Sequence, residues 1–135
     1  MYEAVNGYKC GWIGKGKIYI GRSNYKLGLR KSPLANPFTI GEDGDRQQVV
    51  RKYRVWLYER ICLGDRAVIR ELMAIRQKVQ SDRYPNGVQL VCYCKPQECH
   101  GDVIVKCLNW IDDNFDEFQK IAGQNNERAT TPTQS

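Results

Sequence analysis

Apolar residues recur at helical spacing in three stretches of the chain. Residues 46–62 and residues 66–79 each repeat apolar positions at intervals of three and four, which predicts two amphipathic helices. A third helix is predicted to begin at Cys99 or His100 and to run to about Ile121. The polar positions between these apolar stripes would face solvent, so each helix is expected to cover a core with one side only.

Two shorter apolar runs have the character of β-strands. Residues 17–21 are β-rich, and residues 88–94 are apolar enough for a central strand. Residues 23–37 are rich in turn-forming residues and predict a long irregular loop. The order strand, helices, strand, helix predicts a small single-domain α/β fold with a short, mainly parallel sheet flanked by helices. We expect the helix at residues 46–62 to cover one face of that sheet.

Length and composition narrow the class of protein. The 135 residues suit one domain, placed at residues 1–122, and a hydrophobic share of 41% is enough for a core. Residues 123–135 are polar, which predicts a disordered tail. No apolar run approaches the ~20 residues of a membrane span, and residues 1–10 lack the apolar segment of a secretory signal. We therefore expect a cytoplasmic protein with reduced cysteines and no membrane partner.

The positive charge is confined to one part of the sequence. The formal net charge is +6 at pH 7, and residues 4–41 contain seven basic residues and no acidic one. Such a block favours a nucleic acid or a phosphorylated small molecule, although a solvated face that keeps the protein soluble has the same composition. Aromatic residues are interspersed with these cations, as on surfaces that stack bases: Tyr8, Trp12, Tyr19 and Tyr25.

The densest group of reactive side chains follows the second predicted strand. Cys94 is expected at the carboxyl end of that strand, Cys99 and His100 at the start of the next helix, and Asp102 in its first turn. Ligands of open α/β sheets bind at the carboxyl ends of strands, where helix N-termini favour anions and thiolates. These four residues are therefore candidate catalytic residues. Two of them also have a structural explanation that needs no catalytic role. Cys99 could cap the helix, and Asp102 could interact with the helix dipole.

Zinc binding is an alternative interpretation of the same cluster. Four side chains of types that zinc accepts occur together: Cys92, Cys94, Cys99 and His100. One, four and no residues separate successive members of this set, whereas zinc knuckles favour about two to four. Cys92 is also explained as a small core residue. We assign no metal and no cofactor on this pattern.

Two further segments supply candidate ligand-binding residues. Gly21 and Arg22 follow the first strand, where glycine permits close backbone approach and the guanidinium offers a planar fork for phosphate. Two prolines stiffen the loop around Asn36. A stiff loop would let Asn36 recognise a base or a ribose, or else Asn36 hydrogen-bonds its own backbone. With parallel strands, one pocket should be surrounded by Arg22, Asn36, Cys94, His100 and Asp102.

Several motifs occur together in an order that is typical of one family. They are YIGR at residues 19–22, SPLANPF at residues 32–38, Arg46 with the helix that follows it, and LVCYCKP with CHGDVI within residues 90–104. Over about residues 17–110 the chain thus resembles domain of unknown function 4326, which is common in bacteriophages and bacteria. Tyr93 stands where that family usually has tryptophan, and the last turn is also similar to one in domain of unknown function 488.

The resemblance implies an α/β domain of phage or bacterial origin, in the host cytoplasm if phage-encoded, and it implies no reaction. Arg46 joins Gly21, Arg22 and Asn36 as a candidate ligand-binding residue. We favour a protein that binds a nucleotide or nucleoside, or an enzyme on phosphorylated small molecules, with Arg22 on phosphate and Asn36 on base or sugar. The alternatives are a nucleic-acid-binding or nucleotide-sequestering module without chemistry, and a zinc-stabilised accessory protein. An enzyme requires a concave pocket that joins Arg22 to His100.

Overall fold

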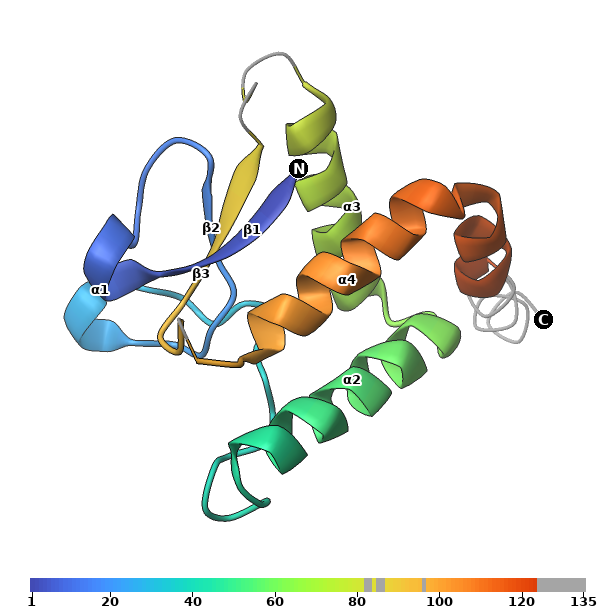
Figure 1. Cartoon of the computed structure of the whole chain (residues 1–135). Coiled ribbons are helices and arrows are strands. Elements are labelled where there is room, and N and C mark those ends of the chain that lie inside the picture. The colour runs from blue at the N-terminus through green and yellow to red at the C-terminus, as the bar shows by residue number, and fades with distance from the viewer. Residues whose placement is uncertain (82–83, 85–86, 96, 124–135) are drawn as a thin grey trace.

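A three-stranded parallel sheet forms the centre of the fold. The computed structural model describes residues 1–81, 84, 87–95 and 97–123. The strands are β1 (Tyr2–Asn6), β2 (Lys17–Tyr19) and β3 (Val88–Cys92), in the order β1-β3-β2 (Figure 1). The predicted parallel pairing of the strands near residues 17–21 and 88–94 is confirmed, with Ile18 opposite Leu90.

Strand β1 was not predicted, because its side chains do not show the clear alternation of apolar and polar residues that identifies a strand. Of its five residues only Val5 is buried, so the apolar alternation that identifies a strand is almost absent. The strand is held instead by its pairing with β3, in which Tyr2 lies opposite Val88 and Asn6 opposite Cys92. The two long-range ladders therefore make β3 the central strand.

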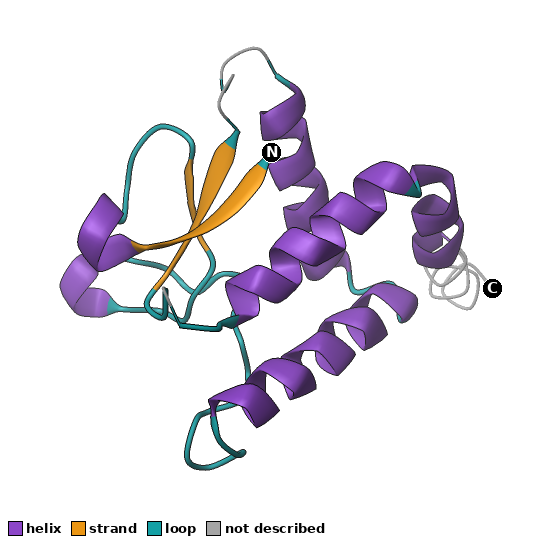
Figure 2. Cartoon of the chain, viewed as in Figure 1, coloured by secondary structure: helices purple, strands orange, loops and turns teal. Residues whose placement is uncertain are grey.

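The helices agree closely with the predicted ones. They are α2 (Arg46–Cys62), α3 (Arg66–Gln80) and α4 (His100–Asp113), with a short α1 (Gly7–Cys10) and a 3-10 turn η1 (Tyr25–Leu27) (Figure 2). Asp45 caps α2 by accepting a 2.8 Å hydrogen bond from the Gln48 amide, and the Gln48 side chain returns a bond to the Asp45 amide. This capping box explains why α2 begins where local sequence predicts.

The arrangement of the helices differs from the prediction in one respect. Helix α4 lies against β1 and β3, and α3 contacts β3, whereas α2 packs mainly on α4 and α3 (Figure 1). The expectation that the helix at residues 46–62 covers the sheet directly is therefore wrong. The apolar stripe of α2 is buried as predicted, but the elements that α2 contacts most are α4 and α3 rather than the strands.

The predicted third helix is broken into two. Helix α4 ends at Asn114, whose φ of −133° and ψ of 43° leave the helical region, and residues 115–123 form a further helix. Phe118 and Ala122 in this further helix are buried against the core, which is why the apolar stripe continues past the break. The tail predicted at residues 123–135 lies, apart from Gly123, outside the described residues.

Two strands end earlier than predicted, at Tyr19 and Cys92 rather than at residues 21 and 94. The Ile20 amide still donates a 3.1 Å hydrogen bond to the Val91 carbonyl, so the backbone remains beside β3 for one more residue. Among the described residues, no helix combines the length and apolar character needed to cross a membrane.

Candidate functional site at the carboxyl edge of the sheet

All three strands end at the same side of the molecule because they are parallel. Asn6 ends β1, Tyr19 ends β2 and Cys92 ends β3. The segments that follow them, α1, the loop after β2 and the turn before α4, lie together on that side (Figure 2). We call this region the carboxyl edge, and it contains Asn6–Trp12, Ile20–Asn24, Tyr93–Lys95 and Gln97–Asp102.

His100 joins the exit of β2 to the start of α4. Its side chain is buried, with a relative exposure of 9%, and its Nε2 lies 2.7 Å from the Ile20 carbonyl oxygen. Burial lowers the pKa of His100 below 6.5, the charge of Arg22 lowers it further, and the hydrogen bond to Ile20 opposes both. The ring is therefore neutral at pH 7, and its Nε2–H donates to the carbonyl. This places His100 as a structural link rather than as an exposed acid or base.

Gly101 allows α4 to approach the sheet closely. A Cβ at this position would lie 3.1 Å from the Ala4 Cβ and 3.1 Å from the Ile20 Cδ1. Glycine here thus brings the first turn of α4 against β1 and the exit of β2. The close approach also positions Cys99 beside the end of β3.

Three cysteines lie at the end of β3 and in the turn that follows it. The Cys92 and Cys99 sulfurs are 3.3 Å apart, and both side chains are buried, whereas Cys94 is half-buried. The Cys99 S–H lowers the pKa of Cys94 to about 6, and the Arg46 guanidinium contributes, although burial opposes both. Cys99 itself has a raised pKa because it is the donor, and it lowers the pKa of Cys92 as well. Cys99 has one proton to donate, so we assign the thiolate to Cys94, which Arg46 also faces.

The turn between β3 and α4 is held from three elements. The Asn6 side-chain amide donates to the carbonyls of Tyr93 at 3.2 Å and Lys95 at 2.7 Å. Arg46 Nη1 donates to the Glu98 carbonyl at 3.2 Å. Asp102 pairs with Lys95 at 2.6 Å and accepts from the Cys99 amide at 3.1 Å. Asp102 thereby closes a capping box on α4 from the first turn, where only a role as partner of the helix dipole was foreseen for it.

Arg22 and Asn36 meet in the loop after β2. Arg22 donates to the Asn36 carbonyl at 3.0 Å, to the Phe38 carbonyl at 2.9 Å and to the Thr39 hydroxyl at 3.0 Å. The Asn36 side chain accepts from the Phe38 amide at 2.9 Å. Both side chains thus stabilise this loop, and Asn36 adopts the self-bonded turn that was the alternative to ligand recognition.

An aromatic cluster covers the outer side of the carboxyl edge. It consists of Tyr8, Trp12, Tyr19 and Tyr93. The Trp12 ring centre is 4.8 Å from that of Tyr93 and 4.9 Å from that of Tyr8, and the indole packs flat on the backbone of Gly7. Tyr8 keeps 70% of its surface exposed. The cluster therefore presents an exposed ring on a packed aromatic base.

Hydrogen bonds fix the inner rings of this aromatic cluster. The hydroxyls of Tyr19 and Tyr93 are 2.7 Å apart, and the Asn24 side-chain amide donates to the Tyr93 hydroxyl at 3.1 Å. The Tyr19 hydroxyl also donates to the Arg22 carbonyl at 2.5 Å, and a Cβ at Gly21 would lie 2.4 Å from that hydroxyl. Burial and the bond to Tyr93 raise the pKa of Tyr19. The absence of a side chain at Gly21 is thus explained by the space that the Tyr19 ring occupies.

A family model described as a domain of unknown function, DUF4326, matches residues 7–110. The chain belongs to this family. No curated protein and no solved structure matches the chain. The family match confirms the resemblance of the sequence motifs, and it contains the whole carboxyl edge except Asn6.

Two cavities of this DUF4326 domain lie away from the carboxyl edge. One of about 440 Å³ is at the opposite end of the sheet, beside Tyr2 and Gln89, and one of about 330 Å³ lies on α2 beside Lys52 and Trp56. The five residues predicted to surround one pocket line neither cavity. Among the residues that the structure describes, no group of three or more His, Cys, Asp or Glu is placed to hold a metal ion.

The DUF4326 domain nevertheless brings most of the candidate residues together. Cys94, Cys99, Asp102 and Arg46 surround the turn before α4, and His100 lies beneath it. Arg22 and Asn36 are in the adjacent loop. Sequence reasoning missed Asn6 because β1 was not predicted, and it noted Tyr93 only as a departure from the family pattern.

Proposed function

We propose that the carboxyl edge binds a phosphate-bearing nucleobase, as a nucleotide or as part of a short single-stranded nucleic acid. The observation that carries this proposal is the exposed Tyr8 ring on the packed Trp12 and Tyr93 rings. Stacking of a base on an aromatic side chain contributes about 1–3 kcal/mol, and it is tolerant of base identity.

The inner rings are already ordered before a ligand arrives. Tyr19, Tyr93 and Asn24 form a hydrogen-bonded network, and Trp12 is pressed on Gly7. A base that stacks here would not need to immobilise these side chains, so little of the interaction energy would be lost to ordering them.

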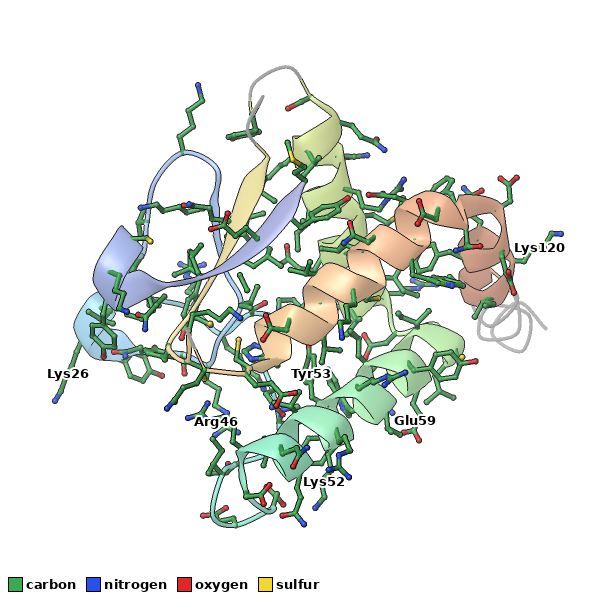
Figure 3. All side chains as sticks on the ribbon, in the orientation of Figure 1. Lys26, Arg46, Lys52, Tyr53, Glu59 and Lys120 are labelled. Carbon is green, nitrogen blue, oxygen red and sulfur yellow. The ribbon has the colours of Figure 1, made fainter. Side chains whose placement is uncertain are left out.

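Cations at the same edge supply the second half of the proposed recognition. Lys9 in α1 and Lys26 in η1 are exposed, and Arg46 at the start of α2 is half-exposed. Figure 3 shows Lys26 pointing away from the molecule on the side of η1 and Arg46 below the turn that follows β3. No acidic residue occurs between residues 4 and 41, so phosphate meets no opposing charge from this part of the chain.

The proposal is for binding rather than for acid–base catalysis. The His100 Nε2 is occupied by the Ile20 carbonyl, and Asp102 is paired with Lys95 and with the Cys99 amide. These contacts show that two of the four candidate catalytic residues, His100 and Asp102, hold the turn in place. Arg22 has a similar structural role in its loop, and Arg46 holds the Glu98 carbonyl, so phosphate recognition is assigned first to the exposed Lys9 and Lys26.

The test compares two exposed tyrosines in one titration. Tyr8→Ala removes the outer ring of the aromatic cluster, and Tyr58→Ala removes a ring of 65% exposure on α2. Calorimetric titration with adenosine monophosphate and with a short oligothymidylate, each at two salt concentrations, should show Tyr8→Ala weakening affinity by about 5- to 100-fold. Tyr58→Ala should bind as the wild type does.

The two ligands distinguish the two sources of the same chemistry. Binding of the oligonucleotide alone, with a steep salt dependence, assigns the site to single-stranded nucleic acid, and binding of the mononucleotide assigns it to nucleotides. Wild-type affinity in Tyr8→Ala for both ligands, or no binding by the wild-type chain, would overturn the proposal.

A further inference from the structure

The three cysteines at this turn are arranged for transfer of oxidation from the surface to the interior. Cys94 is half-buried, and Cys99 and Cys92 retain exposures of only 2% and 1%. The Cys99 sulfur lies 3.3 Å from that of Cys92, and Cys94 follows Cys92 by two residues in the turn that leads to Cys99. None of these thiols is used in the proposed binding of a base, so the inference below stands independently of it.

We propose that Cys94, Cys99 and Cys92 form a thiol relay that reduces a small hydroperoxide and stores the oxidation as a buried Cys92–Cys99 disulfide. The Cys92 and Cys99 sulfurs are 3.3 Å apart. A disulfide bond has a length of about 2.05 Å, so a movement of little more than about 1 Å would join them.

Cys94 is the entry point because a peroxide reacts with a thiolate that it can reach. The Cys99 S–H and the Arg46 guanidinium both stabilise the Cys94 thiolate, whose pKa is about 6. A thiolate of this kind is the form that peroxides oxidise. Asp102 opposes this stabilisation, but its carboxylate is paired with Lys95.

The first step consumes the peroxide. The Cys94 thiolate attacks one oxygen of hydrogen peroxide, the S–O bond forms and the O–O bond breaks. The departing hydroxide takes a proton from solvent and becomes water, which leaves Cys94 as a sulfenic acid. Cys94 is thereby oxidised by two electrons, and the peroxide is reduced.

Two exchange steps then move the oxidation inward. The Cys99 sulfur attacks the Cys94 sulfur, and its proton leaves with the sulfenic hydroxyl as water, which gives a Cys94–Cys99 disulfide. The Cys92 sulfur attacks Cys99, releases its proton to solvent and displaces Cys94 as a thiolate. In total, one hydrogen peroxide and two thiols yield one disulfide and two waters.

The hydrogen bonds that hold the turn do not involve the sulfurs that exchange. Asn6 holds the carbonyls of Tyr93 and Lys95, and Arg46 holds that of Glu98. These bonds involve backbone atoms and leave the sulfurs free to pair. Cys94 is the most exposed sulfur of the three and is the leaving group of the last step, so it is returned in the form that reacts again.

The experiment follows the oxidation state of each cysteine in the full chain. Reduced protein, freed of oxygen and supplied with a chelator, receives one equivalent of hydrogen peroxide, and iodoacetamide then blocks the remaining thiols. Peptide mass spectrometry should find a Cys92–Cys99 disulfide in the wild type. In Cys92→Ala the oxidation should stop at a Cys94–Cys99 disulfide.

Cys99→Ser should stop the relay at its first product, because the resolving sulfur is gone. Dimedone should then label the Cys94 sulfenic acid. Serine is a good N-cap residue, so this variant keeps the start of α4. Cys94→Ser should slow disulfide formation at least about tenfold, because only buried thiols remain at the turn. Cys62→Ser, at the end of α2, is the control and should leave the rate unchanged.

Cys10 is an exposed reference within the same molecule. If Cys10 is oxidised as fast as Cys94 in the wild type, or if Cys94→Ser forms the disulfide at the wild-type rate, the relay is wrong. These results do not depend on whether Cys99→Ser folds. The nucleotide titrations remain a separate test, since they measure the loss of the Tyr8 ring, which none of these cysteine variants changes.

Discussion

At the scale of single residues, the carboxyl edge is organised by polar side chains that bond to backbone carbonyls. His100 donates to Ile20, Asn6 to Tyr93 and Lys95, and Arg46 to Glu98. Each of these side chains comes from a different element than its acceptor. A buried carbonyl without a partner costs about 1–3 kcal/mol. Each donor therefore holds the loop of its acceptor in one conformation.

His100 should give the folding stability a specific pH dependence. Its pKa in the folded chain is below 6.5, so near and below that pH the unfolded chain binds a proton that the folded chain does not. The free energy of unfolding therefore falls as the pH drops below 6.5 towards the folded pKa. His100→Gln keeps a donor for Ile20 but does not titrate, so urea unfolding measured between about pH 5 and pH 8 should show a flatter profile.

The comparison of the two profiles isolates the histidine. It is the only histidine of the chain, and the Cys94 thiol, with a pKa of about 6, contributes equally to both proteins. The matched variant is His100→Ala, which also does not titrate but lacks the donor, so it should be less stable than His100→Gln by about 1–3 kcal/mol at every pH. A wild-type slope in His100→Gln would contradict the assignment of a neutral buried ring.

At the scale of elements, packing of α4 on the sheet decides where the site residues lie. Gly101 has no side chain at the point where α4 meets β1. Cys99 and His100, which directly precede it, contact Cys92 of β3 and the Ile20 carbonyl after β2. A small displacement of α4 would separate the sulfurs and break the bond to Ile20 together. The first turn of α4 is thus the element on which the candidate site depends.

Gly101→Ala tests this dependence. The new Cβ would lie 3.1 Å from both the Ala4 Cβ and the Ile20 Cδ1, tighter than ordinary van der Waals contact, so α4 or these side chains must yield by a few tenths of an ångström. We expect a loss of about 1–3 kcal/mol in the free energy of unfolding, measured by urea denaturation, despite the better helix propensity of alanine. Gly123→Ala is the matched control, since no atom lies within 4 Å of its Cβ and the same propensity gain applies. Equal stability of Gly101→Ala and Gly123→Ala would show that the contact between α4 and β1 accommodates a methyl group.

Local signals explain which elements the sequence predicts. The bounds of α2 and α3 follow from caps at Asp45 and Asp65 and from apolar spacing, all of which lie within a few residues of each helix. Strand β1 has one buried side chain, and its existence depends on pairing with β3 more than eighty residues away. Apolar spacing predicts that α2 buries one face, but not that α4 is the partner. Long-range pairing is the information that a local pattern lacks.

The candidate site shows the same division. The rule that ligands and helix starts gather at the carboxyl ends of parallel strands brought Cys94, Cys99 and His100 together correctly. It could not show that the His100 and Arg22 side chains donate hydrogen bonds to backbone carbonyls of the loop after β2. Those contacts arise from the path of the loop after β2, which no spacing in the sequence specifies.

At the scale of the whole molecule, the sheet is complete only with residues that precede the family match. The match begins at Gly7, directly after β1. Yet β1 pairs with β3 along its full length, α4 packs on β1, and Asn6 holds the turn of the thiol cluster. The carboxyl edge therefore joins a strand outside the match to the motifs inside it, and neither part forms the site alone.

A chain that begins at Gly7 should consequently fail to fold cooperatively, although it contains every residue of the family match. Its β3 would have an open edge, α4 would lose its contact with Ala4, and the buried Val5 side chain would be missing. Thermal unfolding followed by circular dichroism should show no sharp transition. Val5→Ala should show a smaller loss of about 1–3 kcal/mol, while Glu3→Ala, exposed on the same strand, should match the wild type. A truncated chain with the wild-type midpoint would mean that β1 is an addition to a fold that stands without it.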